Sequence, residues 1–340
     1  MARRITLKDV SARAGVSTYT VSQALAGKAG VSDETREMVI RTADEMGYVT
    51  NVLAANLKGQ TSSTVGVMTA SGRNQYYSML VQGIDGVLQQ YGLHAVTNDA
   101  MRGGVYNAEL ERESVSALLQ QRVALIVATY SLGESSLRAI REWDIPLVFV
   151  DSLPPAAAEP CPFVGCDNRL AGELVAEHLA GLGHRNAVFL GFPADWNTRL
   201  PREAGFRDAA SRLGMSVTTV ESENTAEGAY AAMRGHLAEV GSGSFDAIYA
   251  SNTPLLHGVL RALRDEGLSV PESVSVVGFD EFEWAELLSP SVTVVDQHIE
   301  QIGREAGRLI AEIVTEGREV TEHLAIRPDL IIRQSTAPRH

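Results

Sequence analysis

The 340-residue chain has only two cysteines, Cys161 and Cys166, and neither belongs to a Cys/His set at zinc-finger spacing. Two reduced thiols are therefore expected, ahead of a zinc site or a redox switch. No apolar run approaches the roughly 18 residues that cross a bilayer. The opening Met1-Ala-Arg-Arg leads into a polar segment instead of a secretory core, so we expect a cytoplasmic protein without a membrane partner.

Motifs of the common α/β enzymes are absent as well. The chain contains no Gly-x-x-x-x-Gly-Lys phosphate loop, no nucleophile elbow, no Gly-x-Gly-x-x-Gly and no His-Glu-x-x-His. Its Asp, His and Ser residues are scattered along the sequence and form no recognisable catalytic motif. We expect neither enzymatic activity nor a cofactor or metal, although an α/β enzyme of another kind stays open as an alternative.

Positive charge is scarce outside the N-terminal region. Residues 1–60 carry eight Lys or Arg against six Asp or Glu, whereas the rest of the chain carries 21 against 36. Only the N-terminal region can therefore approach phosphates with little electrostatic repulsion, and the acidic remainder disfavours indiscriminate binding to nucleic acid.

Residues 5–27 have the pattern of two short helices joined by a tight turn. Leu7, Val10 and Ala14 recur at helical spacing, Gly15 supplies the permissive conformation of the corner, and Ser17 is a natural N-cap. On the second helix an apolar stripe of Val21, Ala24 and Leu25 leaves a polar outer arc, made of Thr18, Tyr19, Ser22 and Gln23.

This outer arc suits a DNA major groove. A Gln side chain can bond the N6/N7 edge of adenine, and hydroxyls can bond phosphates or bases. The alternative is the ordinary polar face of a helix in a small bundle. A third helix is predicted to begin at Ser32 and to end at Gly47, with Met38, Ile40 and Ala43 completing the core.

Residues 51–59 are good helix formers but too few to be helical alone in water. Such a segment folds only when docked. The large apolar residue near its end, Leu57, is either a wedge inserted between base steps from the minor groove or a contact with the next domain.

From residue 61 onward, short apolar runs alternate with amphipathic helices, which predicts parallel sheets covered on both faces. The predicted strands are 64–68, 93–96, 124–127, 146–150, 187–190, 216–220, 247–249 and 274–279, and the predicted helices are 77–91, 106–121, 168–182, 203–213, 226–240, 254–266 and 299–316. Ligands of open parallel sheets bind at the carboxyl ends of the strands. The polar and aromatic residues that follow the strands are Tyr76, Tyr77, Asp151, Trp196, Asn252, Asp280, Phe282 and Trp284.

Several motifs in order resemble transcription regulators of the lactose/galactose repressor (LacI/GalR) family. They are Thr6-Leu-Lys-Asp-Val, Ala14-Gly-Val-Ser, Thr20-Val-Ser, Val31-Ser-Asp-Glu-Thr-Arg, Gly47-Tyr, the segment ending at Leu57, Asp167-Asn, His178-Leu, Gly183-His-Arg, Arg202 before Gly205-Phe, and Val277-Gly-Phe-Asp. The joint order and spacing make the resemblance specific, and it covers nearly the whole chain.

The resemblance implies an all-α helix-turn-helix headpiece in residues 1–60, with a hinge helix at 51–58, and an α/β core in residues 61–340. The core would be a two-lobed, periplasmic-binding-protein-like (type I) fold with parallel doubly wound sheets. Its N-lobe would hold residues 62–161 and 292–323, and its C-lobe residues 162–291 and 324–340.

The implied site residues fall into two sets. The DNA-binding set is Thr6, Ser17, Thr18, Tyr19, Thr20, Ser22, Gln23, Asn51 and Leu57, and the effector-binding set is Tyr76, Asp151, Trp196, Arg202, Asn252, Asp280 and Gln297. Structural alternatives exist: Asp280 could cap a helix, Arg202 could pair with Glu203, and Trp196 or Trp284 could simply be buried at a lobe junction.

The chain departs from the family pattern at Thr50, Ala55, Thr253 and Gln23, and it ends without the heptad tail that joins dimers into tetramers. We therefore expect a homodimer that binds double-stranded, pseudopalindromic operator DNA as a repressor and responds to a small molecule, a sugar or its derivative. A soluble sugar receptor would share the core but would have no use for the first 60 residues.

Overall fold

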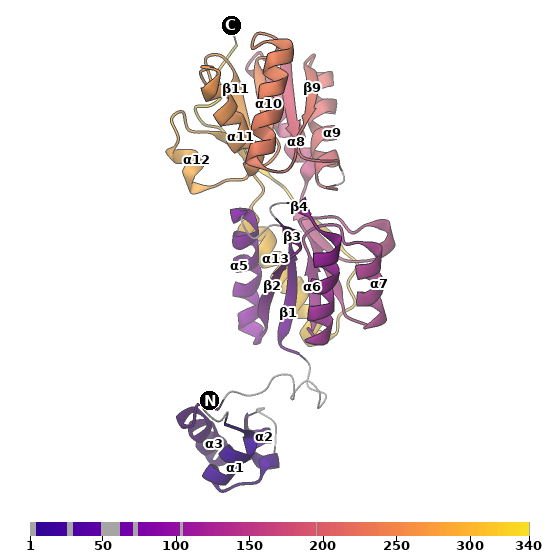
Figure 1. Cartoon of the computed structure of the whole chain (residues 1–340), viewed down its shortest axis with the longest axis vertical. Helices are drawn as coiled ribbons and strands as arrows, with labels where there is room; N and C mark the ends of the chain where they lie inside the picture. The colour runs from indigo at the N-terminus through magenta and orange to yellow at the C-terminus, as the bar shows by residue number, and fades with distance from the viewer. Residues whose placement is uncertain are drawn as a thin grey trace. The chain divides into compact units, whose positions relative to one another are not determined.

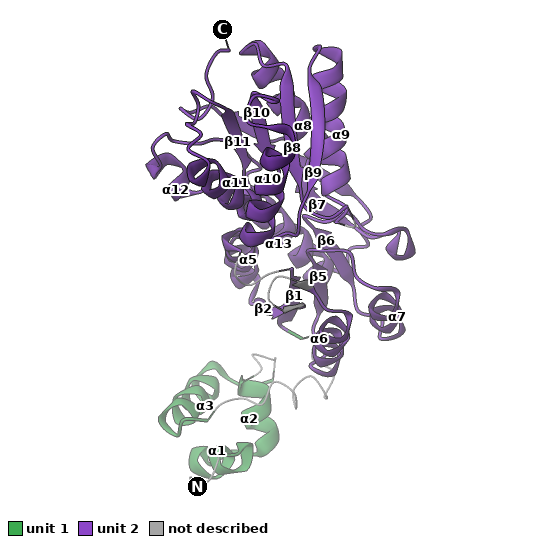
Figure 2. Cartoon of the chain, turned by 45° about the horizontal axis from the view of Figure 1, so that its top comes forward, with its two compact units in different colours: residues 1–62 green, residues 63–340 purple. Residues whose placement is uncertain are grey.

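The computed structural model describes residues 5–25, 30–48, 62–70, 74–102, 105–194 and 196–339. The chain forms two compact units, residues 1–62 and 63–340 (Figure 2). The boundary lies two residues beyond the predicted one at 60/61. None of the described helices is long and apolar enough to cross a membrane.

The first unit consists of three short helices, α1 (Leu7–Ala14), α2 (Thr18–Leu25) and α3 (Asp33–Glu45). Thr6 caps α1 in a reciprocal capping box with Asp9. Gly15 follows α1 with φ 68°, the left-handed conformation that lets the chain turn directly into the next helix. The predicted cap of α2 is present, because Ser17 Oγ accepts a hydrogen bond from Thr20 N at 3.0 Å.

The core of this unit contains one correction to the sequence prediction. Val10, Val21 and Val39 are fully buried, and Ala24 and Ala43 are nearly so, whereas Ile40 is 42% exposed. Val39 and Ala43 are four residues apart and share one face of α3, and Ile40 lies about 100° further round that helix. Val39 therefore takes the place predicted for Ile40.

The second unit contains two six-stranded sheets, with helices on the faces of each (Figure 1). The first has the order β13-β7-β6-β5-β1-β2, with strands β1 (Thr64–Thr69), β2 (His94–Asp99), β5 (Leu125–Ala128), β6 (Leu147–Val150), β7 (Phe163–Cys166) and β13 (His323–Ile326). The second has the order β14-β12-β11-β10-β8-β9, with strands β8 (Asn186–Gly191), β9 (Ser216–Glu221), β10 (Ala247–Ala250), β11 (Ser275–Phe279), β12 (Thr293–Asp296) and β14 (Asp329–Ile331). All neighbours in these two sheets are parallel except β12 and β14, which confirms the predicted parallel architecture.

The described part of this unit contains nine α-helices, and seven of them were predicted from the periodicity. The nine are α5 (Gln75–Leu88), α6 (Ala108–Gln120), α7 (Glu134–Glu142), α8 (Asn168–Gly181), α9 (Arg199–Arg212), α10 (Ala226–Val240), α11 (Thr253–Asp265), α12 (Glu283–Leu287) and α13 (Ile299–Glu316). The pattern missed α7, α12, four sheet strands and the short hairpin of β3 (Met101–Arg102) and β4 (Val105–Tyr106). The missed strands are three or four residues long and carry too little pattern to be separated from loops.

All three predicted lobe boundaries come too early in the chain. Two of them are early by one strand, and the third, after residue 323, falls inside β13 of the first sheet. Strand β7 was predicted to open the second lobe (the C-lobe) but belongs to the first sheet. Strand β12 was predicted in the first lobe (the N-lobe) but belongs to the second sheet. The chain therefore passes between the lobes near residues 167, 297–298 and 327–328. The assignment of a short buried strand depends on its hydrogen-bonded neighbour, which the strand's own residues do not specify.

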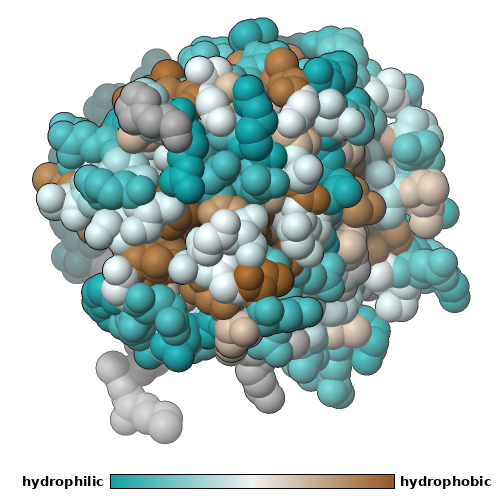
Figure 3. Space-filling view, turned by 90° about the horizontal axis from the view of Figure 1, so that it is seen from above, coloured by the Kyte–Doolittle hydropathy of each residue, from teal (hydrophilic) through white to brown (hydrophobic). Residues whose placement is uncertain are grey.

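Close helix packing positions residues of α9 at the interior. A Cβ added to Gly172 of α8 would lie 2.2 Å from the Arg202 carbonyl oxygen of α9. Glycine is required at this crossing because the two backbones touch. Viewed from the end that carries the second lobe, the surface is mainly hydrophilic, with hydrophobic residues in small scattered groups (Figure 3).

Candidate functional site

A cavity of about 250 Å³ lies where the carboxyl ends of strands from both sheets meet. All seven residues of the predicted effector set line it, namely Tyr76, Asp151, Trp196, Arg202, Asn252, Asp280 and Gln297. Asp151 follows β6 of the first sheet, whereas Asn252, Asp280 and Gln297 follow β10, β11 and β12 of the second. Residues distant in sequence thus converge, as expected for strand ends of two facing lobes.

Arg202 is the buried cation of this cavity, at 4% exposure. Its Nε and Nη2 donate to Asn168 Oδ1 at 3.0 and 2.6 Å, and Nη1 donates to the Ser251 carbonyl. The guanidinium also lies over the Phe279 ring, 3.3 Å from its centroid. Arg202 does not form the alternative ion pair with Glu203. Glu203 is instead paired with Arg199, whose Nη2 lies 3.0 Å from its carboxylate oxygen.

Asp280 and Gln297 form a buried pair at the second lobe's strand ends. Asp280 accepts hydrogen bonds from Thr253 Oγ1 at 3.0 Å and from Gln297 Nε2. Burial raises the pKa of the Asp280 carboxyl, and the nearby Arg202 charge opposes that rise. Asp280 is not a helix cap, since Phe282 occupies that position for α12.

Asp151 is the second carboxylate of the cavity. The pKa of Asp151 is raised to about 7, mainly by burial. The Arg202 charge and the Tyr76 hydroxyl act in the opposite direction and limit this rise. Both Asp151 and Asp280 adopt positive φ, 69° and 78°. Such a conformation costs energy for a residue with a Cβ, and here it aims each carboxyl into the cavity at the end of its strand.

The remaining predicted residues have mixed roles. Asn252 Oδ1 caps α11 by accepting from Leu255 N at 3.0 Å, and its Nδ2 donates to Asn224 at 2.7 Å. Trp196 is half-buried between the hydrophobic clusters of the core and lines the cavity. Trp284 does not line it, and instead lies 6.1 Å from Phe282 in a stacked arrangement.

Sequence reasoning missed a group of aromatic and amide residues in the lining, which includes Asn74, Tyr106, Tyr130, Phe192, Asn197 and Asn224. Tyr106 belongs to the short strand β4, and Asn74 caps α5. Tyr130 and Phe192 follow β5 and β8, so the rule that ligands bind at the ends of strands could have found these two. Among the described residues, the buried hydroxyl of Tyr130 and the buried Oε1 of Gln297 have no hydrogen-bond partner. Polar atoms of this kind are ready to bond a ligand.

The cavity therefore combines two carboxyl groups, one guanidinium, several amides and aromatic rings. Ligand hydroxyls can donate to the carboxylates and accept from amides, and sugar rings can lie on aromatic faces. No group of His, Cys, Asp or Glu that could hold a metal ion is found within the described ranges, and both cysteines are free thiols.

In the first unit, the candidate DNA-contacting side chains lie along α2. Ser17, Thr18 and Tyr19 are exposed, the last at 72%, and Thr20, Ser22 and Gln23 are half-buried. Two hydroxyls are already engaged locally, because Ser17 Oγ and Thr20 Oγ1 are 2.9 Å apart. Thr6 caps α1, and Asn51 and Leu57 lie outside the described residues.

Comparison with known proteins identifies the chain's family. Residues 6–51 match "Bacterial regulatory proteins, lacI family", and residues 176–336 match a periplasmic binding protein-like domain. The HTH-type transcriptional regulator MalR of Streptomyces coelicolor is 30% identical, over 97% of this chain and 96% of its own length. The chain belongs to the lacI family of bacterial regulatory proteins. The LacI-family resemblance carried by the motifs is confirmed, and the chain is a DNA-binding transcriptional regulator.

Solved LacI-family structures share its fold. The lac repressor dimer bound to operator and the anti-inducer ONPF is 26% identical, with a TM-score of 0.83 over 98% of this chain and 100% of that one. The complex of the transcriptional regulator CelR with cellobiose is 28% identical, with a TM-score of 0.72 and the same coverage.

Proposed function

We propose that the protein is a dimeric LacI-family repressor whose affinity for a pseudopalindromic operator is set by a sugar, or a sugar derivative, bound between the lobes of its core. The observation that carries the proposal is the cavity at the strand ends, where Asp151, Asp280 and Arg202 converge beside Tyr76 and Trp196. We infer that this site binds its ligand without transforming it, in the cytoplasm.

The chemistry of the lining favours a polyhydroxylated ligand. Arg202 already donates to Asn168 and Ser251, so a strongly anionic ligand would have to displace those bonds. The carboxyl groups and the amides together offer both acceptors and donors, which hydroxyls match in either sense. The CelR relative carries cellobiose, which is a ligand of this class.

Exposed apolar residues of the core support a dimer. Leu287 is 82% exposed and Leu288 39% exposed on and after α12, and Tyr91 and Val96 are exposed next to and on the edge strand β2. Large exposed apolar groups indicate a protein interface, and an exposed edge strand needs cover. A second copy of the chain is the proposed occupant, as in the lac repressor dimer.

Two-fold symmetry would present the α2 helices of two chains to two half-sites of one operator. A ligand that prefers one arrangement of the lobes would shift the population of the 51–58 hinge segment and thereby change operator affinity. Linkage requires that operator DNA change the ligand's affinity by the same factor. The hinge helix and the Leu57 wedge remain predictions from the sequence.

The test begins with a thermal-shift panel of the full chain against monosaccharides, cellobiose, sugar phosphates and nucleobases. The sugar with the largest shift is then added to a gel shift on an operator selected from random DNA. A specific complex that changes with that sugar supports the proposal. A chain that binds a sugar but no specific DNA would be a receptor, which contradicts the proposal.

A further inference from the structure

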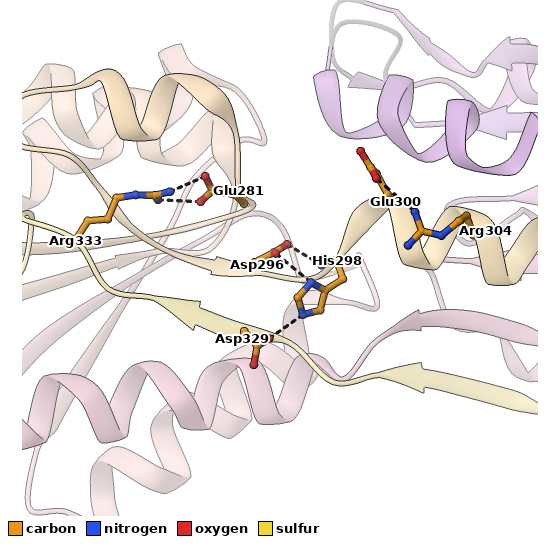
Figure 4. Close-up of polar contacts among 7 residues, drawn as sticks. All are labelled: Glu281, Asp296, His298, Glu300, Arg304, Asp329 and Arg333. Atoms are coloured by element: carbon orange, nitrogen blue, oxygen red, sulfur yellow. Dashed lines mark hydrogen bonds and ion pairs between the residues drawn. The ribbon is translucent and has the colours of Figure 1, made fainter. Parts of the chain in front are cut away.

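Two ion-paired groups involve the residues that follow the buried Asp280–Gln297 pair in sequence. Figure 4 draws both groups. The first joins Glu281 to Arg333, and the second joins His298 to Asp296 and Asp329. Glu281 follows Asp280 in sequence, and His298 follows Gln297. Neither group lines the cavity, but each is one residue away from a side chain that does.

The Glu281–Arg333 contact is a two-pronged fork. Arg333 Nη1 and Nη2 donate to the two carboxylate oxygens of Glu281 at 2.8 and 2.7 Å. Nη1 also donates to the Val292 carbonyl at 3.0 Å, and the Arg333 backbone N–H donates to Thr293 Oγ1 at 2.9 Å. Both side chains are largely shielded from solvent, so this bidentate pair holds the loop after β11 rigidly.

The geometry at Asp280 explains why such support is needed. Asp280 has a φ of 78°, which a side chain with a Cβ adopts at a cost, and its backbone N–H donates to the Val295 carbonyl at 2.9 Å. A strained residue keeps its conformation only where its surroundings hold it. The fork on Glu281 is the adjacent ion pair that supplies this restraint.

The second group joins two carboxyl groups that face each other across the pairing of β12 with β14. Asp296 and Asp329 are directly opposed in the antiparallel pairing of β12 with β14. Opposed like charges destabilise a sheet, and the His298 ring lies between them, with Nδ1 3.0 Å from Asp296 and Nε2 3.0 Å from Asp329.

The group around His298 lies where the chain passes between the two lobes. The chain leaves the second lobe after Asp296 and returns to it immediately before Asp329. His298 therefore ties two of the three passages between the lobes to each other. Its φ of 59° turns the chain from β12 into α13, and the same turn directs Gln297 toward Asp280.

We propose that Arg333 and His298 are positioning residues of the effector site: Arg333 holds Asp280 through Glu281, and His298 holds Gln297 through the two lobe passages. This inference rests on the proposed function of the cavity. It assigns a role in ligand binding to the C-terminal segment 329–333, which does not contact the cavity. Substitutions in this segment are expected to alter ligand binding although they change no residue that lines the cavity.

The first test needs no ligand. Amide hydrogen exchange of the full chain is compared among wild type, Arg333→Gln, Arg333→Lys, His298→Asn and Asp329→Asn. Asn tolerates positive φ, so His298→Asn removes the bridge without adding backbone strain. The control is Arg304→Gln, which breaks the exposed Arg304–Glu300 pair on α13 shown in the same view (Figure 4).

Peptides that contain Asp280 and Gln297 are expected to exchange about tenfold faster in Arg333→Gln and His298→Asn, and at the wild-type rate in Arg304→Gln. Arg333→Lys keeps the charge without the fork and should give a smaller increase. Faster exchange confined to β14 and the C-terminal segment would overturn the proposal, because the two groups would then hold only that strand.

The second test measures cellobiose binding by calorimetry in the same variants. A loss of about tenfold in Arg333→Gln and His298→Asn, with no loss in Arg304→Gln, supports positioning of the site. Unchanged cellobiose affinity in all variants would overturn it. If wild type binds no sugar of the panel, the proposed function fails, and the exchange result alone decides whether Arg333 and His298 position Asp280 and Gln297.

Discussion

The side-chain nitrogen of Asn197 lies 2.6 Å from the Leu153 carbonyl oxygen, and this hydrogen bond joins the two lobes of the core. The same amide donates to Ser131 Oγ at 3.0 Å and accepts from Ser152 Oγ at 3.0 Å. Asn197 follows β8 of the second sheet, whereas its three partners follow β5 and β6 of the first. One side chain therefore links both lobes at the cavity.

Removal of this link should loosen the cleft. We expect Asn197→Ala to increase the radius of gyration of the ligand-free protein in small-angle scattering and to lower the free energy of unfolding by about 1–3 kcal/mol. Asn224→Ala is the matched control, because the Asn224 amide bonds Asn252 within one lobe. Equal scattering from wild type and Asn197→Ala would contradict a linking role.

Asp151 should make stability depend on pH. Its folded-state pKa is about 7, above the roughly 3.9 of an unfolded Asp, so the folded chain binds this proton more tightly. The Asp151 contribution is complete below about pH 4 and is lost as pH rises through about 7. Asp151→Asn should therefore gain roughly 4 kcal/mol over wild type between pH 4 and pH 8, measured by urea unfolding. A constant difference between the two proteins across that range would refute the assignment.

Arg202 holds the interior of the cavity together. Arg202→Met would leave Asn168 Oδ1 and the Ser251 carbonyl without their donor and would remove the cation that offsets Asp151 and Asp280. We expect a loss of about 3 kcal/mol in urea unfolding. Arg207→Met, on the exposed side of the same helix, should change stability by less than about 0.5 kcal/mol. Similar losses in the two variants would argue against a special role for Arg202.

Gln23 is predicted to read one base pair in each half-site. Gln23→Ala should alter the preferred base at a single position in a selection from randomised DNA, at a cost of about 1–3 kcal/mol in discrimination. Ser22→Ala serves as a neighbouring comparison that removes only a hydroxyl. An unchanged preference in the Gln23 variant would assign this side chain to the helix surface instead.

Leu287 is the most exposed large hydrophobic residue of the described chain. If it lies in a dimer interface, Leu287→Glu should shift the protein toward monomer in sedimentation velocity, with an association constant about a hundredfold lower. Leu200→Glu, on the 54% exposed Leu200 of α9, is the control. A dimer that persists in Leu287→Glu at low concentration would place the interface elsewhere.

Much of the fold follows from pattern alone. Strands such as 187–190 and 247–249 are continuous apolar runs, and helices such as 299–316 have a clear apolar face, so each could be predicted from its own residues. Core residue Val39 could not be separated from Ile40 in this way, because adjacent apolar residues in a helix differ only in the direction of their side chains. The lobe boundaries failed for a related reason, since β7 and β12 could pair in either sheet.

The sequence by itself determined the family, the helix-turn-helix motif, the alternation of strands and helices, and the residues that end the strands, because these depend on local spacing and composition. Tertiary structure alone decided what those residues meet. It set Arg202 against Asn168 instead of Glu203, joined the lobes through Asn197, and paired Arg333 with Glu281, the residue after Asp280. Such contacts link residues between 34 and 66 positions apart, and a hydrogen bond between distant residues depends on how sheets and helices pack, which no local pattern encodes.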